Sequence, residues 1–167
     1  GIIKPGVPVV IGQTSSESEN VFLDTANRNN SKIYFADQDY KIELTMNSLD
    51  NKKIYSCVNK AGVEYKDLKL DLLGNYQGYN LLTVLKSTDQ LNCLGYNISK
   101  DNLYAGLEDV VENTGVMGRW QTLGYNPKII ADTGHNFDGV SEVIKQLKNC
   151  AFKKLHMVIG FVNDKNI

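Results

Sequence analysis

The most constraining feature of this sequence is the segment Lys128–Val143, KIIADTGHNFDGVSEV, whose pattern changes partway along. It begins with the β-branched pair Ile129-Ile130, which is typical of a short strand, and continues with polar and glycine residues. Apolar residues then recur at helical spacing: Val140, Val143, Ile144 and Leu147. This order predicts a strand, a tight loop and a helix that runs to about residue 149. Ligands of open α/β sheets bind at the carboxyl ends of strands, so Asp132 and His135 are candidates for chemistry.

The first 36 residues predict a similar arrangement. Residues 7–11 (VPVVI) form a continuous apolar run before Gly12, which indicates a buried parallel strand. A helical segment is expected over residues 21–29. After a polar break, residues 33–36 (IYFA) are expected to form a second short strand.

Residues 40–73 show period-two alternation instead. One face of residues 40–46 carries Tyr40, Ile42, Leu44 and Met46, and the other carries charged or hydroxyl side chains. Residues 53–58 and 63–73 are expected to be further strands, with turns at 49–51 and 61–62. Alternating strands joined by short turns predict an antiparallel meander with one solvated face. We interpret it as a β insertion in an α/β domain.

Two helices are expected next, over residues 76–91 and from Ser99 to about Asn113. The first carries Leu81, Leu82 and Leu85 at helical spacing. Ser99 is predicted to be the N-cap of the second helix. The glycine-bearing connection 114–118 is interpreted as a domain boundary, with strands predicted at 119–123 and 155–159 beyond it. We therefore divide the chain into residues 1–113 and 114–167.

Composition excludes several classes of protein. The chain is 42% hydrophobic and 22% charged, with a net charge of −1 and no basic block, so nucleic acid is not an expected partner. No apolar run is long enough to cross a bilayer. Three widely spaced cysteines favour free thiols in the cytoplasm, and no close Cys or His pairs indicate zinc. Because the sequence begins without Met and ends just after a predicted strand, we expect it to be part of a longer protein.

The loop residues after the organising strand allow two interpretations each. Asp132 is placed to accept hydrogen bonds from a ribose diol, or to stabilise the turn by bonding the backbone locally. His135 and Asn136 lie at the junction between loop and helix. They are either ligands of a bound molecule or turn and cap residues.

Two further residues are candidates for nucleotide binding. Arg119 follows Gly118, and its planar fork suits a phosphate, although a surface ion pair is the alternative. Asn80 presents an amide donor and acceptor that match adenine, unless it only bonds locally at its helix start. Trp120 is expected to be a packing residue. The chain contains neither GxxxxGK[ST] nor GxGxxG, so it holds no phosphate cradle of its own.

Five motifs, in order along the whole chain, resemble those of folylpolyglutamate synthase, with or without dihydrofolate synthase activity, in the Mur ligase superfamily. They are GIIKPGVPVVIG at 1–12, LLGNYQGYN at 72–80, MGRWQ at 117–121, DTGHN at 132–136 and GFVNDK at 160–165. The resemblance implies an α/β fold: the end of a P-loop-type central domain with an antiparallel β insertion, then the start of a Rossmann-like C-terminal domain.

The resemblance also implies an activity, in which ATP activates a folate or dihydropteroate carboxylate as an acyl phosphate and the amine of L-glutamate attacks it. By motif position, Asn80 would contact adenine, Arg119 the phosphates and Asp132 the ribose, with Asn136 in the same cleft. Arg119 and His135 are the expected catalytic residues, and Arg119 would stabilise the transferred phosphoryl group. Mg²⁺ would bridge the phosphates, with ligands expected upstream of Gly1.

The chain departs from the family pattern at several positions. Tyr76 stands at the motif His, Thr133-Gly134 at Gly-Ala, Trp120-Gln121 at a hydrophobic-Glu pair, and Phe137 at Pro. We expect a cytoplasmic, monomeric ligase whose isolated fragment is inactive without the phosphate cradle. The alternatives are a cell-wall Mur-type peptide ligase and a non-catalytic nucleotide-binding module.

Overall fold

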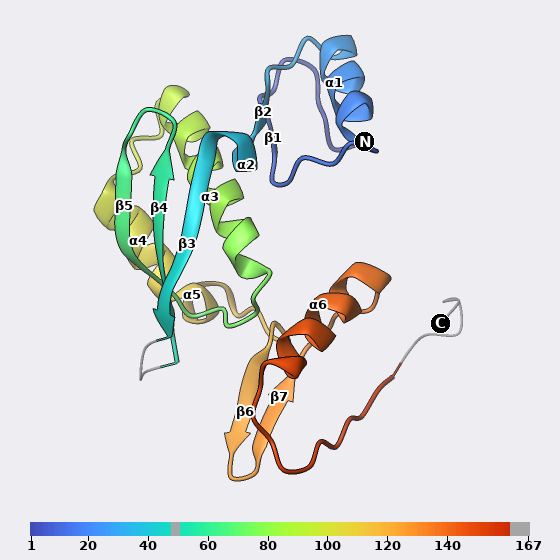
Figure 1. Ribbon diagram of the computed structural model, residues 1–167. Coiled ribbons are helices and arrows are strands. Elements are labelled where there is room, and N and C mark those ends of the chain that lie inside the picture. Colours follow the sequence, from blue (N-terminus) through green and yellow to red (C-terminus); the bar gives the residue numbers. More distant parts are fainter. Residues whose placement is uncertain (48–50, 161–167) are drawn as a thin grey trace. The chain divides into compact units, whose positions relative to one another are not determined.

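The computed structural model describes residues 1–47 and 51–160, and the chain divides into two compact units. Unit 1 is Gly1–Val116 and unit 2 is Met117–Ile167. Each unit is described by itself below (Figure 1). The fold is mixed α/β, as the sequence predicts.

Unit 1 opens with two parallel strands joined by a helix: β1 (Val9–Ile11), α1 (Glu19–Arg28) and β2 (Ile33–Phe35). The two strands are in register from Val9 opposite Ile33 to Ile11 opposite Phe35. The predicted parallel arrangement is therefore confirmed, but the first strand starts two residues later than expected and both strands are only partly buried. The second strand ends at Phe35, because the chain continues directly into the short helix α2 (Ala36–Asp39).

The predicted antiparallel meander is confirmed as a three-stranded sheet in the order β3-β4-β5. Its strands are β3 (Tyr40–Asn47), β4 (Lys53–Asn59) and β5 (Glu64–Leu70). The expected turn at 49–51 lies mostly outside the described residues. Leu44 and Met46 share a predicted face with Tyr40, yet both are exposed, because the register shifts between them and they lie beyond the helices that cover the sheet.

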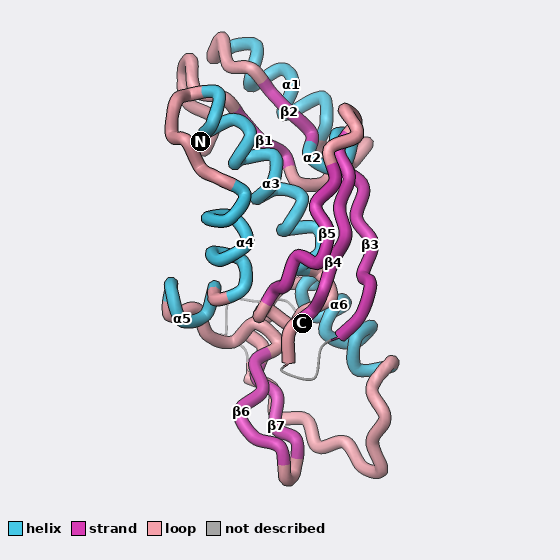
Figure 2. The backbone as a smooth tube through the Cα atoms, turned by 90° about the vertical axis from the view of Figure 1, so that its left-hand side faces the viewer, coloured by secondary structure: helices cyan, strands magenta, loops and turns pink. Residues whose placement is uncertain are grey.

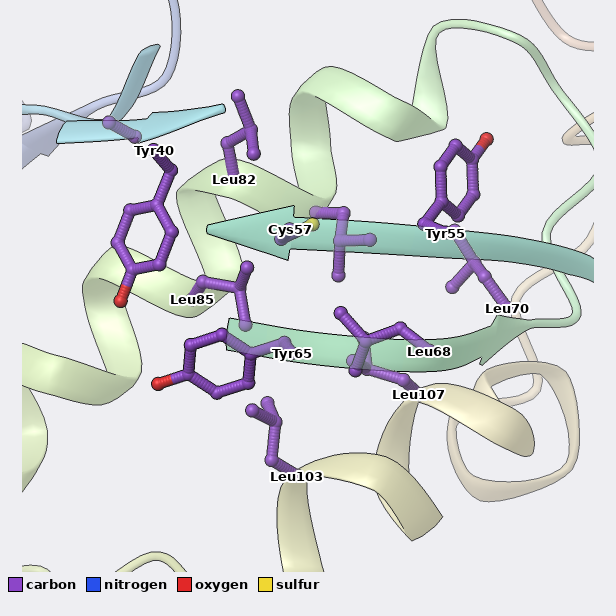
Figure 3. Close-up of a cluster of buried hydrophobic side chains, with 12 residues drawn as sticks. Tyr40, Tyr55, Cys57, Tyr65, Leu68, Leu70, Leu82, Leu85, Leu103 and Leu107 are labelled. Atoms are coloured by element: carbon purple, nitrogen blue, oxygen red, sulfur yellow. The ribbon is translucent and has the colours of Figure 1, made fainter. Parts of the chain in front are cut away.

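Helices α3 (Gln77–Cys93) and α4 (Lys100–Glu108) pack against one face of this sheet, and the core of unit 1 lies between them (Figure 3). The predicted helical stripe Leu81, Leu82 and Leu85 is buried, together with Leu68 and Leu70 from β5. The start of α3 lies within the 72–80 motif. Residue Asn80 thus lies within the first turn of a helix that is anchored by the main core.

The predicted helix from Ser99 to Asn113 is interrupted. Ser99 forms the expected N-cap, with a reciprocal capping box to Asn102. The helix α4 ends at Glu108, however, because Asp109 adopts non-helical angles (φ −130°, ψ 44°), and the short helix α5 (Val110–Thr114) follows. The Asp71 carboxylate accepts the Val111 N–H at 2.8 Å, which supplies the start of α5 with a partner from outside the helix.

Unit 2 contains a β-hairpin and a helix (Figure 2): β6 (Gln121–Tyr125), β7 (Lys128–Ala131) and α6 (Phe137–Lys148). The strand, loop and helix predicted for residues 128–149 are confirmed. The first strand begins at Gln121 and not at Arg119, because Trp120 has a φ of +52°, which lies outside the β region. The two strands pair antiparallel, so the loop after β7 lies at the end of a hairpin and not at the edge of a parallel sheet.

The strand predicted at residues 155–159 is wrong for the described structure. These residues are exposed and adopt no regular secondary structure. A strand needs a hydrogen-bonded neighbour, and no described strand of unit 2 pairs with them. Most of the 160–165 motif lies outside the described residues. None of the described helices is both long and apolar enough to span a membrane. All three cysteines are free thiols, as predicted.

Candidate functional site

Asp132 follows the last residue of β7, and its carboxylate holds two backbone groups. One oxygen accepts the N–H of Gly134 at 2.8 Å, which closes a turn within the loop. The other accepts the N–H of Trp120 at 2.8 Å, which ties the loop to the segment before β6. The turn-stabilising interpretation of Asp132 therefore describes its contacts.

Arg119 lies in a segment whose backbone is unusual on both sides. Gly118 has a φ of +68° and Trp120 one of +52°, both in the left-handed region. The N–H of Gly118 donates to the side-chain oxygen of Gln121 at 2.9 Å. Trp120 is only 5% exposed, so its ring is a packing residue, as expected. The result is a short loop, fixed at its ends, that carries an exposed arginine side chain.

The Arg119 guanidinium is held by a hydroxyl and not by a carboxylate. Its Nη1 donates to Oγ1 of Thr133 at 2.9 Å. Within residues 1–47 and 51–160, no carboxylate lies at ion-pair distance from it. The alternative of a surface ion pair is therefore not realised in the described structure. The full positive charge is oriented and remains available to an anion.

His135 and Asn136 make local contacts at the start of α6. The ring Nδ1 of His135 lies 3.1 Å from the carbonyl oxygen of Thr133, and because a carbonyl only accepts, this nitrogen carries the proton in that bond. The Nε2 of the neutral ring is then an acceptor. The Asn136 side chain accepts the N–H of Gly139 at 2.9 Å and caps α6. The NH₂ group of the same side chain takes no part in this cap.

Asn80 lies in unit 1, on the first turn of α3. Its Nδ2 donates to Oε1 of Gln77 at 2.8 Å, and Gln77 is itself buried. This bond fixes the rotation of the amide. The Asn80 Oδ1 remains directed away from that bond and can accept from an exocyclic amine.

A buried lysine supports the loop that leads to this helix. Lys53, on β4, is 5% exposed, and its Nζ donates to Oδ1 of Asn75 in the 72–80 motif. Burial lowers the pKa of Lys53 from its usual 10.5 to about 8. The sequence analysis placed Lys53 in a strand without a role, and no periodic signal distinguishes it from its half-buried neighbour Lys52.

The five predicted site residues divide between the units: Asn80 lies in unit 1, and Arg119, Asp132, His135 and Asn136 lie in unit 2. Within unit 2 the structure brings Arg119 next to the loop 132–136, through Thr133. Sequence reasoning missed Thr133 and Gln121 as supports of this arrangement. The available signal was that Thr133 replaces a motif glycine with a side chain able to form hydrogen bonds.

Metal ligands are sparse in the described part of the chain. No group of three carboxylate, imidazole or thiol side chains lies close enough to hold an ion among these residues. The described residues therefore offer no complete set of protein ligands, whereas Mg²⁺ usually keeps several waters and binds one or two carboxylates together with substrate phosphates.

Comparison with known proteins identifies the relatives of this chain. No family model matches it. The folylpolyglutamate synthase of Lacticaseibacillus casei is 23% identical over 168 residues, which covers 99% of this chain and 38% of that enzyme. The UDP-N-acetylmuramoyl-L-alanyl-D-glutamate–2,6-diaminopimelate ligase of Geobacillus kaustophilus is 31% identical over 108 residues, or 64% of this chain and 19% of that ligase.

Solved structures agree with the sequence matches. A folylpolyglutamate synthase from Thermotoga maritima superposes with a TM-score of 0.70 and 28% identity, covering 89% of this chain and 33% of that protein. A complex of a folylpolyglutamate synthase with AMPPCP and folate gives a TM-score of 0.76 at 23% identity, covering 89% of this chain and 35% of that one.

The chain thus spans less than two fifths of the length of each relative described above. Both kinds of comparison name the enzymes that its motifs resemble, and the expectation of an α/β fold of the Mur-ligase type is confirmed. The chain is a relative of the folylpolyglutamate synthases and shares their fold.

Proposed function

We propose that this chain forms part of an ATP-dependent amide ligase that adds L-glutamate to the carboxylate of a folate or dihydropteroate. One observation carries the proposal: an arginine with no carboxylate partner among the described residues is held next to the DTGHN turn. Both segments match motifs of the same enzyme family in the expected order. The described contacts preorganise a cation, which is what charge stabilisation in phosphoryl transfer requires.

The proposed reaction has two steps. A substrate carboxylate oxygen attacks the γ-phosphorus of ATP, the bond to the bridging oxygen breaks, and an acyl phosphate and ADP form. The glutamate amine then attacks the acyl carbon, the C–O bond to phosphate breaks, and an amide and inorganic phosphate result. The first step transfers the phosphoryl group, whose oxygens carry negative charge in the transition state, and Arg119 would stabilise that charge.

The other predicted residues take roles that suit their contacts. We propose that Asn80 contacts the adenine of ATP, because its amide orientation is fixed by Gln77. Asp132 would accept from the ribose, because its carboxylate directly follows strand β7 beside the Arg119 segment. Asn136 would offer its NH₂ group to the nucleotide. His135, with its Nε2 available, is the proposed second catalytic residue.

A second candidate is a ligase of cell-wall peptide precursors. The sequence match to the diaminopimelate-adding ligase of G. kaustophilus favours it over 64% of the chain. The matches to folylpolyglutamate synthases extend over 99% of the chain, and the GIIKPG and YQGYN segments resemble those enzymes. The folate ligase is therefore the preferred proposal.

The two candidates are separated by a substrate assay on the full-length protein that contains this chain. ADP release is measured with glutamate plus a pteroate, a folate or a UDP-linked muramyl peptide. We expect turnover only with the pteridine substrates. Turnover only with the UDP-linked peptide would establish the second candidate. If ATP binds but no substrate promotes ADP release, the chain belongs to a non-catalytic nucleotide-binding module.

Arg119→Ala tests the site within that assay. We expect kcat to fall by about one to three orders of magnitude, as for loss of a charged donor at a transition state. Arg28→Ala is the matched control, because Arg28 ends helix α1 in unit 1 and makes only local contacts. An unchanged kcat in Arg119→Ala would remove Arg119 from the reaction.

A further inference from the structure

The side chain of Thr133 lies between two groups of the arginine loop. Its Oγ1 is 3.1 Å from the carbonyl oxygen of Gly118, to which it donates its proton. The same Oγ1 accepts the hydrogen bond of Arg119 Nη1 at 2.9 Å. One hydroxyl thus joins the backbone before Arg119 to the guanidinium of Arg119 itself.

The other branch of Thr133 is also used. A Cβ added to Gly118 would lie 2.4 Å from Cγ2 of Thr133, so the threonine methyl occupies the space that a side chain at position 118 would take. The backbone N–H of Thr133 donates to the same Gly118 carbonyl at 2.8 Å. Although Thr133 is exposed, its rotamer is therefore held by its methyl group and its hydroxyl together.

The neighbours of Thr133 fix the rest of the loop. Asp132 holds the N–H of Trp120, and Gln121 holds the N–H of Gly118. The backbone on each side of Arg119 is consequently anchored without Thr133. Besides the two bonds that the Gly118 carbonyl accepts from it, Thr133 supplies the bond to the guanidinium, which no other described residue provides.

We propose that Thr133 is a positioning residue for the proposed ligase reaction, which holds the Arg119 guanidinium through its hydroxyl in the orientation that meets the transferred phosphoryl group. The inference rests on the proposed function. The motif that this segment resembles has glycine at this position and therefore no side chain to do so. This chain has gained a support that the motif does not specify.

The test uses two substitutions that separate the branches of the side chain. Thr133→Val keeps the branched shape and the methyl packing but removes the hydroxyl. Thr133→Ser keeps the hydroxyl and removes the methyl. Both are made in the full-length protein that contains this chain, alone and combined with Arg119→Ala.

The first readout needs no enzyme activity. The ¹⁵Nε order parameter of Arg119 is measured by NMR, and its signal is assigned as the one that is missing from the spectrum of Arg119→Ala. We expect the order parameter to fall to below about 0.6, the flexible range, in Thr133→Val and to stay at the wild-type value in Thr133→Ser. Equal values in wild type and Thr133→Val, or equal loss in both variants, would overturn the proposal.

The second readout is the kinetic effect. We expect Thr133→Val to lower kcat about tenfold, as for a lost hydrogen bond to a charged group, and to change the KM for ATP less. Thr133→Ser should stay within about twofold of wild type. In the Arg119→Ala background Thr133→Val should have no further effect. A tenfold effect that persists in that background would mean that Thr133 acts through folding and not through Arg119.

The two readouts distinguish the failure of this proposal from failure of the proposed function. A wild-type protein without ligase turnover refutes the function, while the order parameters still decide whether Thr133 holds the guanidinium. A mobile Arg119 in Thr133→Val with undiminished kcat would refute the positioning role in an active enzyme.

Discussion

Replacing Asp132 with Asn tests how the loop of unit 2 is held together. The carboxylate accepts two backbone N–H groups, from Trp120 and Gly134, with one oxygen each. Asparagine has nearly the same shape but only one acceptor oxygen, because its other terminal group is an NH₂ donor. At least one of the two backbone groups therefore loses its partner, and the remaining bond loses its charge assistance.

The expected cost follows from these two losses. Leaving one partly buried N–H without an acceptor costs about 1–3 kcal/mol, and a charged acceptor is worth more than a neutral one by up to about 1 kcal/mol. Asp132 is partly exposed, so water offsets some of this cost. We therefore expect the free energy of unfolding to fall by about 2 kcal/mol.

The assay is urea unfolding followed by Trp120 fluorescence, since the chain has a single tryptophan and it lies buried in unit 2. With a slope of about 1 kcal/mol/M for a unit of this size, the unfolding midpoint should fall by about 2 M. The control is Asp138→Asn, which removes an exposed carboxylate from the first turn of α6 and should cost less than about 1 kcal/mol. Equal midpoint shifts for the two variants would refute the argument that the Asp132 carboxylate holds the loop through its hydrogen bonds to Trp120 and Gly134.

Two further predictions concern unit 1. Leu68→Ala should lower the free energy of unfolding by about 2–5 kcal/mol, because Leu68 is 0% exposed in the main core. The measurement is a urea titration followed by circular dichroism. Leu94→Ala is the control, since Leu94 is 60% exposed, and equal losses in the two variants would contradict the core assignment. Burial lowers the pKa of Lys53 from 10.5 to about 8, so its buried charge destabilises the folded protein most below pH 8. Between pH 8 and 10.5 the folded form loses this proton first, so the unfolding free energy should rise with pH by up to about 3 kcal/mol relative to Lys53→Met. Parallel pH curves for the two proteins would contradict it.

Local patterns predicted most of the elements correctly. The β3–β5 meander follows from period-two alternation, and helix α3 follows from the spacing of Leu81, Leu82 and Leu85. The cap at Ser99 was predictable because capping depends on residues within one turn. In each case the information lies within a few residues of the element that it determines.

The wrong predictions of secondary structure arise where residues distant in the sequence determine whether an element forms. The break at Asp109 accompanies a hydrogen bond from Val111 to Asp71, which lies 40 residues earlier in the sequence. The apolar run at 155–159 resembles a strand but has no strand partner among the described residues. The periodicity of apolar residues indicates which side chains favour burial. It does not indicate whether a neighbouring strand or helix is present to bury them.

The candidate site was predictable in its membership but not in its contacts. Motif position and residue chemistry pointed to Arg119 and Asp132, and the structure places them on segments joined by hydrogen bonds. The departure from the motif glycine marks Thr133 as unusual, but its contact with Arg119 was not predictable, because that contact depends on the turn that brings Thr133 beside Gly118. Which of these residues hold the loop, and which are available to a ligand, depends on contacts that form only in the folded chain.

The close approach of Gly118 and Thr133 constrains how this loop can diverge among homologues. A methyl group at one position fills the volume that a Cβ at the other would need. Substitution at these two sites is therefore coupled: a lineage that keeps threonine or valine at 133 must keep glycine at 118. One that reverts position 133 to glycine relieves the steric half of that requirement but still has a φ of +68° to accommodate.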